Sequence, residues 1–147
     1  WKARHGEPPE FDPIELGNLD AKRDWSDSED FVKGVWLMLN QKKPKDYVLS
    51  SGETHSIREF IEEAFKEAGF NGGWNGKGLE EEYVADLSGR KYTLVKVNSV
   101  FYRPAEVELL LGNSIPAQEE LGWKIEVSFC NLVKKMVRYD IDHLNES

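Results

Sequence analysis

The sequence predicts a single α+β domain, because three segments have the apolar periodicity of amphipathic helices and short β-rich segments lie between them. Its 147 residues are close to the commonest size of one domain, and 39% of them are hydrophobic, which suffices for one core. A long alternation of strands and helices around a glycine-rich phosphate turn, typical of dinucleotide-binding domains, does not occur in the sequence.

The N-terminal segment differs from the rest in its proline content, since three of the six prolines lie within its first thirteen residues. We therefore expect residues 1–13 to be irregular and residues 14–147 to form the domain. Because the chain begins on Trp1 rather than Met, we interpret it as a piece of a longer protein or as a processed product.

The first third of the domain predicts a strand, a helix and a second strand. Residues 14–16 predict a short strand, which the turn pair Gly17-Asn18 ends. Residues 27–39 predict a helix capped by Asp27 or Ser28. One face of this helix carries its large apolar side chains, Val32, Val35, Trp36 and Leu39. Residues 47–49 predict a short buried strand.

The next helix has the strongest local signals. Ser56 and Glu59 form a capping box, and Gly69 supplies the C-terminal stop. An amphipathic stripe lies between them: Ile57, Phe60, Ile61, Ala64, Phe65 and Ala68.

The second half of the chain begins with a glycine-rich stretch, residues 71–78, which predicts a loop. Residues 82–87 and 91–97 predict a hairpin. Residues 115–121 predict a short helix that ends at Gly122. We expect Ser128 to cap the last helix, whose apolar stripe is Phe129, Leu132, Val133, Met136, Val137 and Leu144.

Composition excludes several classes of function. There are 19 Lys and Arg against 27 Asp and Glu, a net charge of −8, so general nucleic-acid binding is not expected. No apolar run approaches the ~18 residues of a membrane span, so we expect no membrane insertion. The single Cys130 rules out an internal disulfide and favours a reducing compartment; beside Phe129, we expect it to be a buried, inert thiol.

Some apparent motifs do not have the required context. Tyr92 and Lys96 match the Tyr-x-x-x-Lys pair of short-chain dehydrogenases, but their alternating, β-branched surroundings predict a strand, on which the two side chains would be roughly 13 Å apart. The Gly72–Gly78 stretch has the wrong spacing for a phosphate loop. The three histidines have no metal-site spacing, and we expect His55 to pack or hydrogen-bond locally.

Two segments are candidates for ligand binding, because each places an arginine beside an aromatic residue. Arg23 lies in Arg-Asp-Trp, and Arg103 lies three residues before Glu106. A guanidinium group suits phosphate oxygens, and a carboxylate accepts hydrogen bonds from ribose hydroxyls. The alternative is that Arg23–Asp24 and Arg103–Glu106 are ordinary surface ion pairs.

Several stretches of the chain resemble the GDP-mannose 4,6-dehydratase family, within the extended short-chain dehydrogenases/reductases. The order and spacing match over roughly residues 14 to 142. The run Gly-Asn-Leu-Asp-Ala-Lys-Arg-Asp-Trp is the most specific of them. The matching stretches are Leu16–Trp25, Asp30–Leu39, Pro44–Phe60, Phe101–Glu108 and Leu121–Lys124.

The resemblance implies that this chain is the small C-terminal substrate-binding domain, without the Rossmann domain, plus a strand and helix that cross back to that domain. NADP and all catalytic residues would then belong to the missing N-terminal half. Arg23 and Arg103 would bind the diphosphate of GDP-mannose or of another nucleotide sugar, Glu106 a ribose hydroxyl, and Leu16 and Gly17 the nucleotide through their backbone. The parent would be a cytoplasmic homodimer or homotetramer.

The sequence differs from the family it resembles at Ser26-Asp-Ser-Glu29, where the family has Gly-His-Ala-Lys or similar. We expect these two added acids, beside a diphosphate site, to weaken binding. Two alternatives to a GDP-mannose 4,6-dehydratase therefore stay open. One is a related nucleotide-sugar dehydratase, epimerase or reductase, and the other is a non-catalytic, degenerate paralogue that acts as an interaction module.

Overall fold

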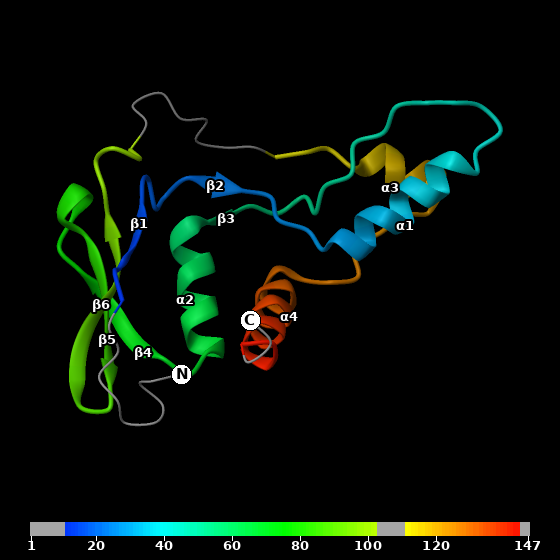
Figure 1. Cartoon of the computed structure of the whole chain (residues 1–147). Helices are drawn as coiled ribbons and strands as arrows, with labels where there is room; N and C mark the ends of the chain where they lie inside the picture. The colour runs from blue at the N-terminus through cyan, green and yellow to red at the C-terminus, as the bar shows by residue number, and fades with distance from the viewer. Residues whose placement is uncertain (1–10, 103–110, 145–147) are drawn as a thin grey trace.

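The computed structural model describes residues 11–102 and 111–144. They form two packed parts, a sheet covered by helices and a smaller helical part at the other end of the molecule (Figure 1). The predicted mixture of helices and strands is confirmed. Residues 11–13 have no regular secondary structure, as expected, and residues 1–10 lie outside the described residues.

A four-stranded sheet has the order β1-β6-β5-β4. β1 (Ile14–Leu16) runs parallel to β6 (Arg90–Val97), and β5 (Glu82–Leu87) and β4 (Asn71–Asn75) continue the sheet in antiparallel pairing. The hairpin between β5 and β6 is confirmed, and its turn residues have the positive φ angles of 57° and 82° that a tight two-residue turn needs.

The strand β4 overturns the prediction of a loop over residues 71–78. Gly72 faces β5 so closely that a Cβ atom on it would lie 2.5 Å from the carbonyl oxygen of Val84. Trp74 packs on Tyr83 with a ring distance of 5.2 Å. The glycines therefore allow a close strand pairing that depends on the partner strand, and the short 3₁₀ helix η2 (Gly78–Glu80) follows it.

Tyr92 and Lys96 lie on the strand β6, as the alternation predicts. They therefore do not share a helix face, and the structure gives no support to a catalytic Tyr-x-x-x-Lys pair.

The helix α2 (Ile57–Glu67) covers one face of the sheet, and α4 (Phe129–Asp142) lies on the opposite side of α2 (Figure 1). The predicted capping box of α2 is confirmed in both directions. Ser128 is at the N-cap of α4 as expected, but its hydroxyl makes no capping hydrogen bond. The core between α2 and the sheet is Leu19, Ile61, Tyr83, Ala85, Leu87, Leu94 and Val95.

The smaller part consists of α1 (Ser28–Leu39) and α3 (Ile115–Leu121). Asp27 caps α1, and Gly122 ends α3 with a φ of 68°, both as predicted. Trp123 is 2% exposed at the centre of this part, with Ala117 and Leu121 around it.

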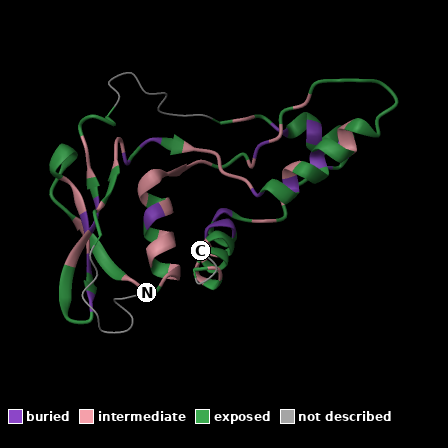
Figure 2. Cartoon of the chain, in the orientation of Figure 1, coloured by how far each residue is buried: buried purple, intermediate pink, exposed green. Residues whose placement is uncertain are grey.

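The outer face of α1 is exposed to solvent, although it carries four large apolar side chains (Figure 2). Their exposed fractions are 68% for Val32, 48% for Val35, 64% for Trp36 and 80% for Leu39. Nearby, residues 47–49 form no strand, and Val48 is 53% exposed, so the prediction of a buried strand is wrong. A strand needs a hydrogen-bonding neighbour, and the described residues supply none here.

Candidate functional site

A hollow of about 290 Å³ lies where the sheet-bearing part meets the helical part. It is lined by Arg23, Asp24, Phe31, Val48, Leu49, Ser50, Leu111 and Gly112. The lining combines a cationic side chain with several apolar residues, which suits a ligand with an anionic group and a ring system.

Arg23 belongs to β2 (Lys22–Arg23), which pairs antiparallel with β3 (His55–Ser56) and places Arg23 opposite His55. Its Nη1 donates a hydrogen bond to the carbonyl oxygen of Lys22 at 2.8 Å. Trp25 anchors the end of this strand, since its ring packs 5.3 Å from Phe60 and 5.8 Å from Phe129. Strand pairing and aromatic packing together hold Arg23 at the hollow.

Asp24 fixes the turn at Ser51 and Gly52, which follows the hollow-lining residues Val48, Leu49 and Ser50. Its carboxylate accepts hydrogen bonds from the backbone N–H and hydroxyl of Ser51 at 3.0 and 2.6 Å, and from the N–H of Gly52 at 3.1 Å. Asp24 is therefore a positioning residue rather than only half of a surface ion pair. The sequence analysis missed this role, because 27 residues separate Asp24 from Ser51 and no spacing signal connects them.

Leu16 and Gly17 contact the turn that leads to the Arg103 segment. The carbonyl oxygen of Leu16 accepts a hydrogen bond from the N–H of Asn98 at 2.8 Å. A Cβ atom on Gly17 would lie 2.2 Å from the carbonyl oxygen of Phe101 and 3.3 Å from the nitrogen of Tyr102. Only glycine permits this approach, so Gly17 fixes the place where the chain runs toward Arg103.

Arg103 and Glu106 lie outside the described residues. The last described residue before them, Tyr102, contacts Gly17, and Gly112 on the other side of the gap lines the Arg23 hollow. Gly112 packs so tightly there that a Cβ atom on it would lie 2.5 Å from Cβ of Ser50. The convergence of Arg23 with Arg103 stays a prediction.

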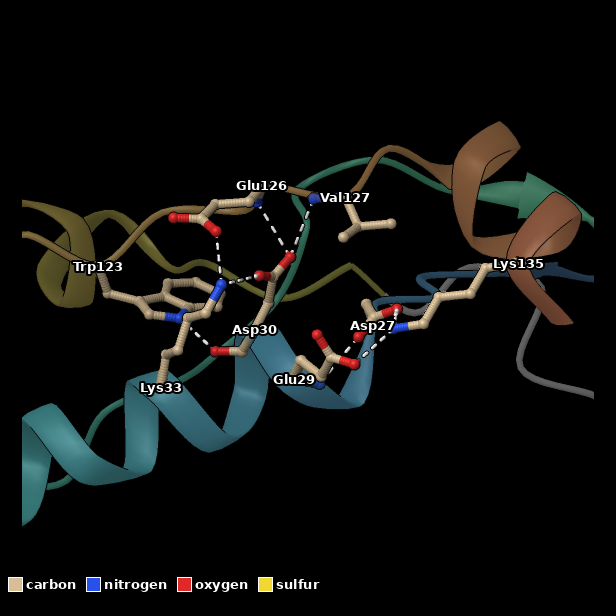
Figure 3. Close-up of polar contacts among 8 residues, drawn as sticks. All are labelled: Asp27, Glu29, Asp30, Lys33, Trp123, Glu126, Val127 and Lys135. Atoms are coloured by element: carbon tan, nitrogen blue, oxygen red, sulfur yellow. Dashed lines mark hydrogen bonds and ion pairs between the residues drawn. The ribbon is translucent and has the colours of Figure 1, made fainter. Parts of the chain in front are cut away.

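The acidic turn at Ser26–Glu29 is not part of the lining of the Arg23 hollow. Asp27 and Glu29 both bind Lys135 of α4, at 3.0 and 2.8 Å (Figure 3). The N–H of Glu29 and then Lys135 lower the pKa of Asp27, and the carboxylates of Glu29 and Asp27 raise the pKa of Lys135. These two acids share a cation, and Asp27 also caps α1. The expectation that they weaken anion binding stays a prediction.

Asp30 is fully buried and connects α1 to the segment after α3 (Figure 3). Its carboxylate accepts hydrogen bonds from the N–H groups of Glu126 at 2.9 Å and Val127 at 3.0 Å, and its carbonyl oxygen accepts one from Trp123 Nε1 at 2.7 Å. These bonds fix the first turn of α1, and the next residue, Phe31, lines the hollow. This network was not predicted from the sequence, because 96 and 97 residues separate Asp30 from the two N–H groups.

Two further side chains can be compared with their predictions. His55 packs locally, as expected, with its ring stacked on Phe129 at 3.8 Å. Cys130 is exposed, so the expectation of a buried thiol is wrong; the buried residues of α4 are Phe129, Leu132 and Val133.

Within residues 11–102 and 111–144, no group of three or more His, Cys, Asp or Glu side chains could hold a metal ion. No helix in the same ranges is long and apolar enough to cross a membrane.

The sequence model of the family described as GDP-mannose 4,6 dehydratase matches residues 5–136. A GDP-mannose 4,6 dehydratase of Dictyostelium discoideum is 48% identical over 129 residues, which are 88% of this chain and 36% of that relative. The Homo sapiens GDP-mannose 4,6 dehydratase is 42% identical over 127 residues, 86% of this chain and 34% of that relative. The chain thus spans about a third of the length of these relatives.

Solved structures share the fold at low sequence identity. The structure of RMD from Pseudomonas aeruginosa complexed with NADPH superposes with a TM-score of 0.65 at 19% identity, covering 93% of this chain and 38% of that one. The UDP-glucose 4-epimerase of Thermotoga maritima with UDP-glucose superposes with a TM-score of 0.67 at 16% identity, covering 98% and 38%. The family match over most of the chain and the identity to its relatives show that this chain belongs to the GDP-mannose 4,6-dehydratase family.

Proposed function

We propose that this chain is the substrate-binding portion of a GDP-mannose 4,6-dehydratase, a lyase that converts GDP-mannose to GDP-4-keto-6-deoxymannose. The observation that carries the proposal is the hollow beside Arg23, in a chain whose family membership extends over residues 5–136. In a chain of net charge −8, an arginine in the lining of a largely apolar hollow is a specific feature that favours an anionic ligand.

Each site residue then has one task. Arg23 and Arg103 bind the diphosphate, because a guanidinium group donates paired hydrogen bonds to phosphate oxygens. Glu106 accepts a hydrogen bond from a ribose hydroxyl, and the backbone of Leu16 and Gly17 contacts the nucleotide. Binding energy from the nucleotide holds the hexose in place for a reaction that other residues perform.

NADP supplies the hydride chemistry of this reaction, and we propose that it binds outside the described residues. Dinucleotides bind where a parallel strand leads through a glycine-rich turn into a helix N-terminus. Within residues 11–102 and 111–144 the parallel pairing is that of β1 with β6, and the glycines of residues 72–78 lie in and after the antiparallel strand β4. These residues therefore do not fit the cofactor, and no catalytic residue is assigned to this chain.

The exposed apolar face of α1 suggests that another domain covers it in the parent protein. Four large side chains on one helix face, beside the unpaired residues 47–49, are a surface that a soluble protein usually covers. We propose that the N-terminal redox domain of the parent packs on this face, and that the parent forms a homodimer or homotetramer.

Titration of the chain with GDP-mannose by isothermal calorimetry or by ¹H–¹⁵N NMR tests the binding part of the proposal. Arg23→Ala should weaken binding by roughly ten- to hundredfold, as expected for one hydrogen bond to a charged group. Arg90→Ala, at the exposed start of β6, is the matched control and should bind as the unaltered chain does. Equal affinities of the Arg23 and Arg90 variants would remove Arg23 from the site.

The catalytic part of the proposal needs the longer parent protein. Incubated with NADP and GDP-mannose, it should release a 4-keto-6-deoxy sugar nucleotide, detected by mass spectrometry after borohydride reduction. A parent that folds and binds GDP-mannose but yields no such product would contradict the assignment as a dehydratase.

A second candidate is a related enzyme acting on another nucleotide sugar, which the shared fold with UDP-glucose 4-epimerases favours. Competition between GDP and UDP for the chain separates the two, since stronger displacement by UDP would support the second candidate. The ion pairs of Asp27 and Glu29 with Lys135 argue against the non-catalytic alternative, because these acids are partly neutralised and do not line the hollow.

A further inference from the structure

The hollow beside Arg23 contains a polar atom whose hydrogen-bonding capacity is unused. Ser50 is 5% exposed, and its hydroxyl oxygen is enclosed without a hydrogen-bond partner. Buried hydroxyls nearly always have a partner, because an enclosed polar group without one destabilises the fold. A serine that departs from this rule inside a candidate binding site requires an explanation.

The carboxylate of Asp24, which lines the same hollow, is already engaged by other donors. Its Oδ1 accepts hydrogen bonds from the N–H and hydroxyl of Ser51 and lies 3.4 Å from the hydroxyl of Ser26, and its Oδ2 accepts one from the N–H of Gly52. Most of the roughly four acceptor positions of this carboxylate are therefore occupied. The hydroxyl of Ser50 has no hydrogen-bond partner, although its two following neighbours are bonded.

The surroundings of Ser50 keep its hydroxyl away from bulk water. Gly112 crosses so closely that a Cβ atom on it would lie 2.7 Å from Oγ of Ser50 and 3.1 Å from Val48. Both residues line the same hollow as Arg23. Ser50 lines this hollow as well, so a group bound there would lie beside it, and the guanidinium of Arg23 in the same lining favours an anion.

We propose that Ser50 is a further ligand-binding residue, whose hydroxyl donates a hydrogen bond to an oxygen of the phosphorylated ligand held by Arg23. The proposal rests on the proposed function, because it places the phosphate of a nucleoside diphosphate in this hollow. It adds a donor that neither the motifs nor the family match assigns. The unsatisfied hydroxyl destabilises the unliganded chain and is satisfied when the ligand binds.

The test is a pair of buried serines with opposite expected effects. In Ser50→Ala, thermal unfolding without ligand should shift upward by about 3 °C, because an unpaired polar atom is removed. The affinity for GDP, measured by calorimetry, should fall roughly ten- to hundredfold. In the control Ser114→Ala, which is 4% exposed and accepts a hydrogen bond from Gln118, the unfolding temperature should fall and GDP affinity should not change.

The outcomes separate this inference from the function on which it rests. GDP binding that depends on Arg23 but is unchanged in Ser50→Ala would overturn the role of Ser50 and leave the proposed function intact. A lower unfolding temperature of Ser50→Ala would overturn the premise that its hydroxyl is unpaired. No GDP binding by the unaltered chain would overturn the proposed binding function first, and the role of Ser50 with it.

Discussion

Removal of the Asp30 carboxylate should be one of the most destabilising single changes in this chain. Asp30 is fully buried, and Oδ2 accepts hydrogen bonds from two backbone N–H groups, those of Glu126 and Val127. Asp30→Ala leaves both N–H groups without this partner, at up to about 1–3 kcal/mol for each partly buried donor. We expect a loss of about 3–5 kcal/mol in the free energy of unfolding, the range observed when a buried charged network is broken.

Asp30→Asn refines this prediction. The amide keeps one oxygen with two acceptor positions, so the two N–H groups can remain bonded while the charge is lost. We expect this variant to be destabilised by about 1–2 kcal/mol, less than Asp30→Ala. The order of the two variants therefore reports on the hydrogen bonds rather than on side-chain volume.

Urea unfolding followed by circular dichroism at neutral pH measures both variants. Glu29→Ala is the matched control, since Glu29 is an acid in the same helical turn whose side chain is 69% exposed and ion-paired to Lys135. It should change the free energy of unfolding by at most about 1 kcal/mol. If Asp30→Ala unfolds at the same urea concentration as Glu29→Ala, the buried network does not stabilise the fold as argued.

Three further changes test other parts of the structure. In the folded chain the pKa of Asp27 is lowered, chiefly by a backbone N–H of α1 and then by Lys135, so its stabilising effect is present above its unfolded pKa and is lost as pH falls through its folded pKa. Asp27→Asn should flatten this acid-side loss of stability in urea titrations at several pH values. Gly17→Ala should lower the free energy of unfolding by about 1–3 kcal/mol, because the added Cβ would lie 2.2 Å from the carbonyl oxygen of Phe101. The control Gly73→Ala should not be destabilised in this way, since its added Cβ would have nothing within 4 Å. Equal unfolding midpoints of the two variants would contradict the close approach at Gly17. Trp36 is 64% exposed on the outer face of α1, so Trp36→Ser should change the free energy of unfolding of this chain by at most about 0.5 kcal/mol. In a longer parent protein that covers this face, the same change should lower stability. Limited proteolysis of both proteins measures the difference.

Helix boundaries were predictable because their signals are local. The Ser56–Glu59 capping box, the Asp27 cap and the stop at Gly122 each depend on residues within one turn of the helix end. The hairpin turn is equally local, since its left-handed residues lie between two alternating segments.

The candidate site was only partly predictable. Arg23 was found because an arginine beside an aromatic residue is a recognisable pattern. The contacts of Asp24 and Asp30 were not, because each joins segments that are distant in the sequence. The proposed role of Ser50 was not either, because it rests on a hydroxyl without a partner, which only the folded chain shows. From the sequence alone, an acidic residue that will be buried cannot be distinguished from one that will be exposed.

The sequence by itself determined the helices, the β5–β6 hairpin and the family, since these follow from periodicity, capping residues and ordered motifs along the chain. Tertiary structure decided that residues 71–75 form a strand, that residues 47–49 do not, and that the acids of the Ser26–Glu29 turn bind Lys135. The physical reason is that strand pairing and the balance of a buried or clustered charge require a partner far away in the sequence. Local sequence indicates where these helices begin and end, but a strand or a charge network exists only once the chain has folded.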